Sequence, residues 1–507
     1  MSDFDNTPII VGVGQQTWRE PDASRTPIDA ITEVSALALT DAGSGGVKEA
    51  IDAVATVRFV ADTDPGTGAL FPRNPGKHAA QRLGISNATF YQGVIGGNTP
   101  QYLVNHFADK LVKGEHSAVL ISGAELLATM FSAFKTGGDI SAWAGEQEPE
   151  PTTLGVERDG LNDTEKQYSL YEPINTYPLF ESSLRRHLGR SHEEHQAILA
   201  ELCSGMSRVA AENPVAWSPK ALTAQEISTV SEKNRYIGYP YTKAMNPVLA
   251  VDMGAAVVMT TVGKARELGI DPRQWIYVRG GIDVNDTWHI SERPCLHESP
   301  AIRLAWRRLC DETGIDLDTV TDFDIYSCFP SAVEVACNEI GLSISDPRGV
   351  TVTGGLPYMG GPGNNYSLHA IAAMTARLRE RGNGHGLVTA NGLYLTKHSL
   401  GLYSTEPSGT EWKALDSGVL QQQVDNLPTL SIATDPVGAA TAEAFTVSFD
   451  RNGPKQGIVI AKNDAGDRIL AYTPSDAEIL KQLLDEDVAG RAGQVSVVEG
   501  VNIFKLQ

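Results

Sequence analysis

Side chains that could act on a carbonyl group are concentrated in four glycine-rich segments of the chain. These segments are 95–101, 326–330, 354–363 and 389–394. Breaking or forming a bond beside a carbonyl needs a group that moves a proton and donors that hold the developing oxyanion. The candidate catalytic groups in or next to the segments are Tyr326, Asn391 and His398. Asn98, Tyr358 and Tyr366 are candidates for the oxyanion or substrate pocket, and Lys397 stands beside His398.

Alternating apolar strands and amphipathic helices must position these segments. The periodicity predicts, in chain order, a strand at 7–14, a helix at 26–43, a strand at 53–60, a helix at 99–113 and a strand at 118–123. It resumes with a strand and a helix within 252–269, a helix at 302–314, a strand at 322–326 and a helix at 331–340. Such alternation predicts a parallel or mixed sheet covered by helices, and sheets of this kind place their sites where strands end.

The alternation stops between residues 131 and 241, where the chain is polar, aromatic and rich in charge. An acidic, proline-rich run at 146–151 lies in this part, which we predict to be an inserted helical subdomain or lid. His192 and His195, with Glu193 and Glu194 between them, resemble a metal cluster. Their polar helical stretch at 191–202 instead predicts a solvated face, and we predict no metal site.

The last part of the chain has a different pattern. From about residue 427 there are short alternating runs at 444–449, 457–462 and 468–472, followed by a last strand at 495–504. They predict a small, mostly β barrel-like domain. Thr473 and Pro474 are predicted to begin a helix in this domain, as its cap and first helical residue.

The order and spacing of the glycine-rich segments resemble the thiolase superfamily over roughly residues 7–404. The run SGAE at 122–125 is similar to the G-G-x-E motif of thiolases, and 354–362 has the frame of their G-G-x-x-x-x-G-H-P segment. Residues 390–392 match the C-x-G segment, while Asn246 and 252–256 are similar to N-x-S-x-x-x-D-G-A-A. Within the superfamily the chain most resembles the thiolase-like proteins type 1, which carry an extra C-terminal domain.

The resemblance implies an α/β fold with a duplicated, five-layer α-β-α-β-α arrangement, an inserted loop domain and a small β barrel-like, OB-like domain. A helix, a glycine turn and an acidic approach to a strand recur in 36–54 and 304–320, which favours duplication. The expected parts are 1–126 with 246–275 for the N-terminal half, 127–245 for the loop or lid domain, 276–415 for the C-terminal half and 425–507 for the additional domain.

The residues that do the chemistry of a thiolase are replaced in this chain. The position of the nucleophilic cysteine, counted back from 122–125, falls on Gly97. Gly361 stands at the position of the histidine that activates this cysteine and contributes to an oxyanion hole, and Ala390 at that of the second cysteine, an acid/base. Tyr326 leads the segment where thiolases have the asparagine of N-E-A-F. Because glycine carries no nucleophile, acyl transfer through a covalent intermediate is not expected here.

Three functions remain open for such a frame. The first is an acyl-CoA enzyme similar to an acetyl-CoA acetyltransferase, a transferase of lipid metabolism, working without the cysteine route. The second is a CoA-thioester (retro-)aldolase using Tyr326, because aldolases of the superfamily lead this segment with tyrosine in a Y-D-x-F pattern; Ser327 here replaces the aspartate. The third is a non-catalytic acyl-CoA or lipid-binding protein. The resemblance implies a coenzyme A thioester as substrate or ligand, no covalently bound cofactor, and a possible homodimer.

Composition limits the classes of partner and the cellular compartment that we expect for this chain. The formal net charge of -21 makes nucleic acid and anionic membrane surfaces poor partners. No apolar stretch approaches the roughly 18 residues of a membrane span, and the acidic start at 1–5 lacks the regions of a signal peptide. The five cysteines include no C-x-x-C pair, which argues against a zinc ribbon, and their odd number fits a reducing compartment. We therefore expect a soluble cytoplasmic protein.

Cys328, inside 326–330, is predicted to be a buried packing residue.

Overall fold

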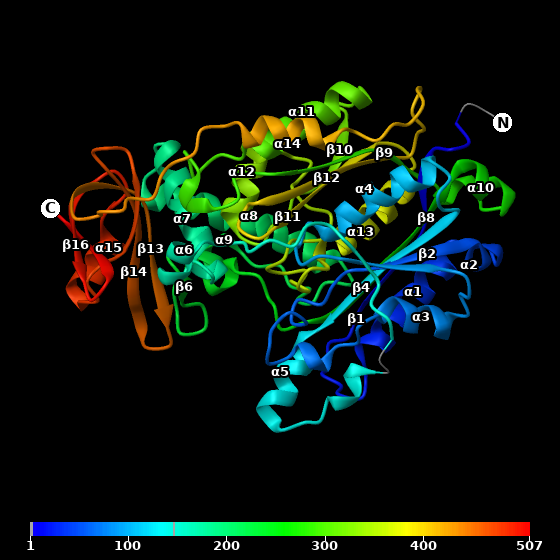
Figure 1. Ribbon diagram of the computed structural model, residues 1–507, viewed down its shortest axis with the longest axis horizontal. Helices are drawn as coiled ribbons and strands as arrows, with labels where there is room; N and C mark the ends of the chain where they lie inside the picture. Colours follow the sequence, from blue (N-terminus) through cyan, green and yellow to red (C-terminus); the bar gives the residue numbers. More distant parts are fainter. Residues whose placement is uncertain (1–3, 146–147) are drawn as a thin grey trace.

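The computed structural model describes residues 4–145 and 148–507, so residues 1–3 of the acidic start and 146–147 of the acidic run lie outside the described residues. Its strands form a ten-stranded sheet in the order β10-β11-β12-β9-β1-β8-β4-β2-β3-β5 and a seven-stranded sheet that includes the C-terminal strands. Figure 1 shows the large sheet with its helices as one body, and the C-terminal strands at the far end of the molecule from the N-terminus.

The N-terminal half of the large sheet contains strands that are buried on both faces. Every residue of β4 is buried, as is every residue but the last of β8. Its strands, in spatial order, are β1 (Pro8–Thr17), β8 (Asp252–Thr261), β4 (Ala118–Leu126), β2 (Ile51–Thr56), β3 (Thr89–Gly93) and β5 (Thr152–Leu154). Strands of this kind need cover on both sides. On the outer side α1 (Pro27–Asp41) packs on β1, β8 and β4, and α3 (Pro75–Leu83) packs on β2, while the short α2 (Gly46–Ala50) leads into β2.

The C-terminal half repeats this plan. Its strands are β9 (Ile276–Asn285), β12 (Lys397–Ser404), β11 (His385–Gly392) and β10 (Val320–Asp324). Its outer helices are α11 (Pro300–Thr313) and α14 (Ser417–Asp425), both packed on β9, and α12 (Pro330–Ile340), packed on α11. The two halves of the sheet join through the antiparallel pairs Ile9 with Tyr277 and Ile10 with Ile276.

Two helices lie between the halves. α4 (Thr99–Val112) contacts β4 of the N-terminal half and β12 of the C-terminal half, and α13 (Tyr366–Arg381) likewise contacts β8 and β11. Their buried residues therefore face strands on two sides. The molecule thus has five layers, which are outer helices, the N-terminal half of the sheet, α4 with α13, the C-terminal half of the sheet, and outer helices again. This confirms the expected five-layer fold.

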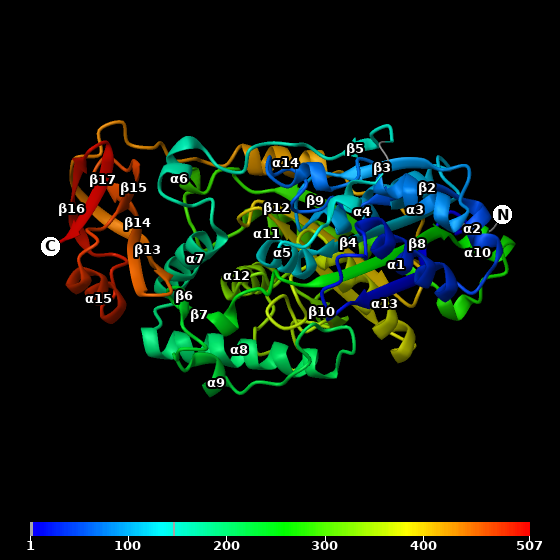
Figure 2. The ribbon, with the colours of Figure 1, turned by 90° about the horizontal axis from the view of Figure 1, so that it is seen from below.

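The inserted segment, residues 127–245, is mainly helical, as predicted. Its helices are α5 (Leu127–Thr136), α6 (Asp163–Gln167), α7 (Pro173–His187), α8 (His192–Glu212) and α9 (Ala224–Ser228), and α10 (Val262–Glu267) follows β8. In Figure 2 α7, α8 and α9 cover one side of the C-terminal half. Short strands link the segment to both sheets: β5 adds to the edge of β3, and β6 (Tyr236–Gly238) pairs with β7 (Tyr241–Thr242) and with β13. Single-turn 3-10 helices lie at Gly68–Leu70, Ser141–Ala144, Lys243–Met245, Pro272–Gln274 and Ile290–Glu292.

The C-terminal strands close into a five-stranded barrel. They are β13 (Gly438–Asp450), β14 (Gly453–Asn463), β15 (Arg468–Tyr472), β16 (Ala492–Val498) and β17 (Val501–Leu506). Their order is β14-β15-β17-β16-β13, and the additional pairing of β14 with β13 closes the ring. This confirms the predicted barrel-like domain.

Two details of the barrel differ from the sequence prediction. Its helix, α15 (Ala477–Asp485), is capped by Asp476, whose carboxylate accepts from the amides of Glu478 and Ile479, so the prediction of Thr473 as cap was wrong. Thr473 is instead buried, with its amide donating to the carbonyl of Gly457. The prediction of a single last strand at 495–504 was also wrong. Glu499 and Gly500 both have positive φ and turn the chain into the hairpin of β16 and β17.

Candidate functional site

The turn before α4, residues 95–98, is the centre of the candidate site, and we name it the central turn. A Cβ atom on Gly97 would lie 2.1 Å from the hydroxyl oxygen of Tyr326 and 2.6 Å from the carbonyl oxygen of Asn391. Both distances are far too short for packed atoms. The Tyr326 phenol therefore stands where a side chain at position 97 would begin.

Tyr326 follows β10 and is held on two sides. Its amide donates to Oγ1 of Thr389 at 3.0 Å, and its ring meets that of Tyr366 edge to face with centroids 5.5 Å apart. Tyr366 opens α13 and donates from its hydroxyl to the buried Asp324 carboxylate at 3.0 Å. Burial raises the pKa of Tyr326 far above its ordinary value. Its hydroxyl is therefore a neutral proton donor at physiological pH.

Three side chains fix the backbone of the central turn. Oδ1 of Asn364 accepts from the amide of Gly96 at 3.0 Å, and Oγ of Ser367 donates to the carbonyl of Gly97 at 2.6 Å. The third, Lys397, donates from Nζ to the carbonyl of Ile95. Asn364 and Ser367 flank the start of α13 and Lys397 opens β12, so residues of the C-terminal half hold this turn of the N-terminal half.

The two asparagine candidates carry buried, unsatisfied oxygens. Nδ2 of Asn98 donates to Oγ of Ser399 at 3.3 Å, and Nδ2 of Asn391 donates to Oη of Tyr177 at 2.9 Å. Within the described residues, neither side-chain oxygen has a hydrogen-bond partner. Only the carbonyl of Asn391 lies against the Gly97 position, because the side chain of Asn391 turns toward α7.

The register of β11 and β12 separates the candidates into two faces. Gly392 pairs with Lys397, Ala390 with Ser399, and Asn391 with His398. Residues paired across neighbouring strands share a face, and successive residues of a strand alternate. Because Lys397 and Ser399 reach the central turn, Ala390 is on their face, and Asn391 and His398 are on the other.

His398 is consequently part of a different buried group, at the start of α11. Its Nε2 lies 3.1 Å from Oδ2 of Asp286, which also accepts from the Ser299 hydroxyl at 2.5 Å. Burial alone would raise the pKa of Asp286, but His398, Arg293 and Ser299 outweigh it and leave that pKa below the ordinary value. This buried pair positions α11, and no contact in the described part of the chain joins His398 to Tyr326.

A cavity of about 410 Å³ opens beside the central turn. Aliphatic side chains line it at Val94, Ile95, Val156 and Leu393, with Thr63, Glu157, Arg158, Asp159 and Lys397 as the polar lining. Burial lowers the pKa of Lys397 to about 8, although the Glu157 carboxylate acts in the opposite direction. A larger cavity of about 990 Å³, between α8 and residues 343–351, contains none of the candidate residues.

The remaining candidate positions lie elsewhere in the core. A Cβ on Gly361 would meet the carbonyl of Val248 at 3.3 Å, so this position faces the end of the inserted segment. The Tyr358 hydroxyl is buried beside Cys203 of α8, which raises the pKa of Tyr358 further above its ordinary value. The structure thus brings together Gly97, Tyr326, Asn98 and the backbone of Asn391, with Tyr366 as support.

The predicted solvated face at 192–195 is only partly present, because Glu193 and Glu194 are exposed and His192 is half-buried while His195 is not exposed. His195 is buried, with Nε2 2.8 Å from Oε1 of Glu181, and Glu334 lies close enough to complete a potential metal-binding group. Arg190, however, donates to Glu334 at 2.7 Å and lies 3.2 Å from Nδ1 of His195. The guanidinium already supplies the positive charge that a cation would bring, so this group is a buried ion-pair network. The sequence missed it because α7 and α12 supply the partners.

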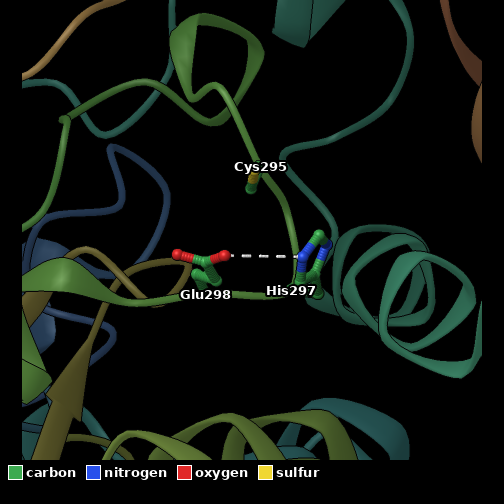
Figure 3. Close-up of side chains that lie close together, drawn as sticks. All are labelled: Cys295, His297 and Glu298. Carbon is green, nitrogen blue, oxygen red and sulfur yellow. Dashed lines mark ion pairs between the residues drawn. The ribbon is translucent and has the colours of Figure 1, made fainter. Parts of the chain in front are cut away.

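Figure 3 shows a second group of side chains that could bind a cation, in the loop before α11. The ligand atoms of Cys295, His297 and Glu298 lie within 4.8 Å of one another, beside a cavity of about 490 Å³ between α7 and the barrel. Thiolate, imidazole and carboxylate are zinc ligands. Nε2 of His297 lies 3.6 Å from Glu298, whose carboxylate also pairs with Arg303 at 3.2 Å. Three donors with one already paired make an incomplete ligand set, and we assign it no metal.

Comparison with known proteins agrees with this architecture. Residues 419–499 match the family model of the thiolase-like protein type 1 additional C-terminal domain. The crystal structure of a monomeric SCP2-thiolase like protein type 1 from Mycobacterium smegmatis is 34% identical, with a TM-score of 0.84, over 99% of this chain and 100% of that chain. No curated protein matches the sequence.

Two more distant structures share the fold. An Ltp2-ChsH2(DUF35) aldolase is 18% identical, with a TM-score of 0.58, over 80% of this chain and 99% of that chain. An acetyl-CoA acetyltransferase from Syntrophomonas wolfei is 13% identical, with a TM-score of 0.53, over 79% of this chain and 100% of that chain. At these identities the likeness concerns the fold alone.

The five-layer body, the closed barrel and the central turn define a thiolase-superfamily protein with an added C-terminal domain. With 34% identity over the whole length of its relative, the chain belongs to the thiolase-like protein type 1 family. In the described part of the chain, no helix combines the length and the apolar character needed to cross a membrane.

Proposed function

We propose that the protein binds a coenzyme A thioester at the central turn and forms no acyl-enzyme there. The observation that carries the proposal is the Tyr326 hydroxyl, 2.1 Å from the position of a Cβ on Gly97. This supports the proposal, because the thiolase resemblance assigns the nucleophile to position 97, and a neutral phenol fills the space that its side chain would need. The cavity of about 410 Å³ that Ile95 and Lys397 line at this turn gives an acyl chain a place.

The central turn offers donors to a thioester carbonyl. α4 begins at residue 99, and its dipole favours negative charge at this end, although the Thr99 amide already donates to the carbonyl of Gly96 and Pro100 has no N–H. The neutral Tyr326 phenol and the Lys397 amine are further donors at the same turn. Such an arrangement favours an enolate or a bound carbonyl oxygen over a covalent intermediate.

Cys328 does not supply the missing nucleophile. Burial raises the pKa of Cys328 to about 12, which leaves the thiol protonated. Its sulfur lies 3.7 Å from Nδ2 of Asn391, on the α7 side of β11. A thiol that is neutral and turned away from the central turn is a poor nucleophile for a bound thioester.

Titration calorimetry with acetoacetyl-CoA tests the binding. We expect saturable binding by the full chain, weakened at least about tenfold by Thr63→Trp, which would fill the cavity mouth. Thr40→Trp, at an exposed position on α1, is the matched control and should bind as the wild type does. No binding by the wild type, or rapid thiolysis when CoA is added, would overturn the proposal.

A second candidate is retro-aldol cleavage of a 3-hydroxyacyl thioester. In this reaction a base of the site takes the hydroxyl proton, the Cα–Cβ bond breaks, and its electron pair passes to the thioester enolate. Protonation of Cα by a neutral donor completes the step, and the position of the Tyr326 hydroxyl favours that phenol as the donor. The aldolase among the similar structures supports the candidate through its fold.

An assay for release of a ketone or aldehyde from 3-hydroxyacyl-CoA thioesters tests this second candidate function. We expect Tyr326→Phe to lose at least about 100-fold in rate, the range typical of a general acid. Tyr171→Phe, at an exposed tyrosine, should keep the wild-type rate. Cleavage that survives in Tyr326→Phe excludes the role of this tyrosine.

A further inference from the structure

Lys397 is a buried amine at the edge of the candidate site. It opens β12 and is only 7% exposed, and its Nζ donates to the carbonyl of Ile95 in the central turn. Lysine is almost never this buried unless it is paired. Across residues 4–145 and 148–507, no carboxylate comes within ion-pair distance of its amine. The fold therefore keeps a costly side chain at a place where it serves no structural ion pair.

Two glycines make room for this side chain. A Cβ on Gly96 would lie 2.7 Å from Nζ of Lys397, and a Cβ on Gly392 would lie 3.0 Å from its Cε. The two glycines belong to different halves of the fold, one in the central turn and the other at the end of β11. Side chains at these positions would displace the amine, so the backbone around it is shaped to admit it.

The amine and the Tyr326 phenol lie at successive residues of the same turn. The hydroxyl of Tyr326 occupies the Cβ position of Gly97, and the amine approaches that of Gly96. The cavity beside this turn is lined by Lys397, by aliphatic side chains and by Thr63, Glu157, Arg158 and Asp159, and Tyr326 is not part of its lining. Burial lowers the pKa of the amine to about 8, so part of the population is neutral and nucleophilic near physiological pH.

We propose that Lys397 forms an imine with the keto group of a 3-oxoacyl thioester. This inference rests on the proposed thioester binding and specifies its substrate class. The Nζ lone pair attacks the keto carbon and a C–N bond forms. The carbonyl oxygen takes up two protons and leaves as water, while nitrogen loses both of its protons. The products are the imine and one water molecule, with no oxidant or reductant.

The chemistry of the amine favours a ketone over the thioester itself. Attack on the thioester would expel CoA and leave Lys397 as a stable amide, which would end its function after one turn. An imine forms reversibly, and its nitrogen, once protonated, withdraws electrons from the neighbouring carbons. A keto group two atoms from the thioester carbonyl also allows one ligand to meet both the amine and the donors of the central turn.

Reductive trapping tests the inference on the full chain. The protein is incubated with acetoacetyl-CoA and sodium cyanoborohydride, which reduces imines in preference to ketones, and peptides are analysed by mass spectrometry. We expect a reduced acetoacetyl adduct on Lys397, formed faster as the pH rises through about 8. Lys397→Arg should abolish the adduct, and Lys113→Arg, at an exposed lysine paired with Asp109, should leave it unchanged.

The outcomes separate this inference from the proposed function. Binding of acetoacetyl-CoA by calorimetry, without an adduct on Lys397 in the wild type at any pH from 7 to 9, would overturn the imine and leave thioester binding intact. An adduct of acetone on Lys397 in a protein that does not bind acetoacetyl-CoA would support a reactive amine and overturn the thioester as its ligand. The wild-type pH profile needs no variant, so it remains informative if Lys397→Arg fails to fold.

Discussion

Tyr326 and Gly97 compete for one small volume, so the structure has no room for a side chain at position 97. The hydroxyl of Tyr326 stands 2.1 Å from where a Cβ on residue 97 would be, and the carbonyl of Asn391 stands 2.6 Å from it. A side chain at 97 and a tyrosine at 326 cannot both be accommodated in this backbone. Burial of the Lys397 amine at the same turn costs free energy, because this amine has no counter-ion among the described residues.

Gly97→Ala should therefore destabilise the protein through overpacking by about 1–3 kcal/mol. Tyr326→Phe removes the nearest of the clashing atoms and leaves the Asn391 carbonyl at 2.6 Å and the ring carbon Cζ at 2.7 Å, so the double variant should recover only part of that loss, which is a coupling between the two sites. Urea unfolding of the four proteins measures it. Gly45→Ala, where a Cβ would meet no atom within 4 Å, is the control and should change stability by less than about 0.5 kcal/mol. Strictly additive effects of the two substitutions would contradict the shared volume.

Lys397→Met should raise stability at neutral pH. The pKa of Lys397 falls from 10.5 to about 8 on folding, so the unfolded chain holds this proton more tightly. The free energy of unfolding of the wild type therefore increases as the pH rises from about 8 to 10.5. Lys397→Met should be more stable than the wild type by roughly 1–3 kcal/mol, and this difference should be largest below pH 8. Denaturation at pH 7 and pH 10 compares the two proteins. A gain that is equal at both pH values would show that the amine is not buried in its charged form.

At the scale of elements, strand register decides which candidates act together. The sequence places Lys397 and His398 side by side, and only the pairing of β11 with β12 shows that they serve opposite faces. His398 joins Asp286 and Ser299 at the start of α11, while Lys397 reaches the central turn. The Asp286 carboxylate also accepts from the amide of Ala301 at 3.0 Å and so caps the helix. One strand thus supplies a structural pair on one face and the buried amine of Lys397 on the other.

Asp286→Asn should destabilise the protein at neutral pH by about 3 kcal/mol, because one partner of a buried pair loses its charge. Its pKa in the folded state is below the ordinary value, so its contribution is present above about pH 4 and is lost as the pH falls through the folded pKa. Urea unfolding at pH 7 and pH 3 should show a deficit that shrinks in acid. Asp464→Asn, at an exposed aspartate, should show none, and a deficit of equal size at both pH values would contradict the ion pair.

The sequence predicted the repeating strands and helices well because their burial patterns are local. The glycine-rich segments likewise predicted that Gly97 and Tyr326 lie close together, since their order fixes where strands end. Long-range packing was not predictable in the same way. His195 lies on a polar helix, yet Glu181 of α7 and Arg190 bury it in an ion-pair network. Asn391 was expected at the site, but its side chain turns to Tyr177 because that strand face looks toward α7.

At the scale of the whole molecule, the inserted segment connects the body to the barrel. β6 pairs with β13, and the amide of Phe445 donates to Oγ of Ser182 in α7. Arg468 of the barrel is buried, pairs with Glu443 at 2.9 Å and donates to the carbonyl of Arg293 in the body at 3.0 Å. The barrel is therefore anchored to the same loop that leads into α11, with the inserted segment between barrel and site (Figures 1 and 2).

We expect the protein to be a monomer in solution. The resemblance allowed a dimer through the sheet near the central turn, but β5 of the inserted segment pairs with β3 and covers that edge. β5 is only three residues long, so the new edge that it forms offers few free backbone donors and acceptors to a second copy. Light scattering after gel filtration should give the mass of one chain, 54.3 kDa. A stable dimer at micromolar concentration would show that another surface, or a displaced β5, forms the contact.

A crystal structure of the protein with acetoacetyl-CoA would test the central claim most directly. We predict the thioester carbonyl beside the central turn and the Tyr326 hydroxyl, with the acyl chain in the cavity that Lys397 lines and with every cysteine unmodified. An acyl group bonded to Cys328, or a ligand bound only in the cavity between α8 and residues 343–351, would contradict the account.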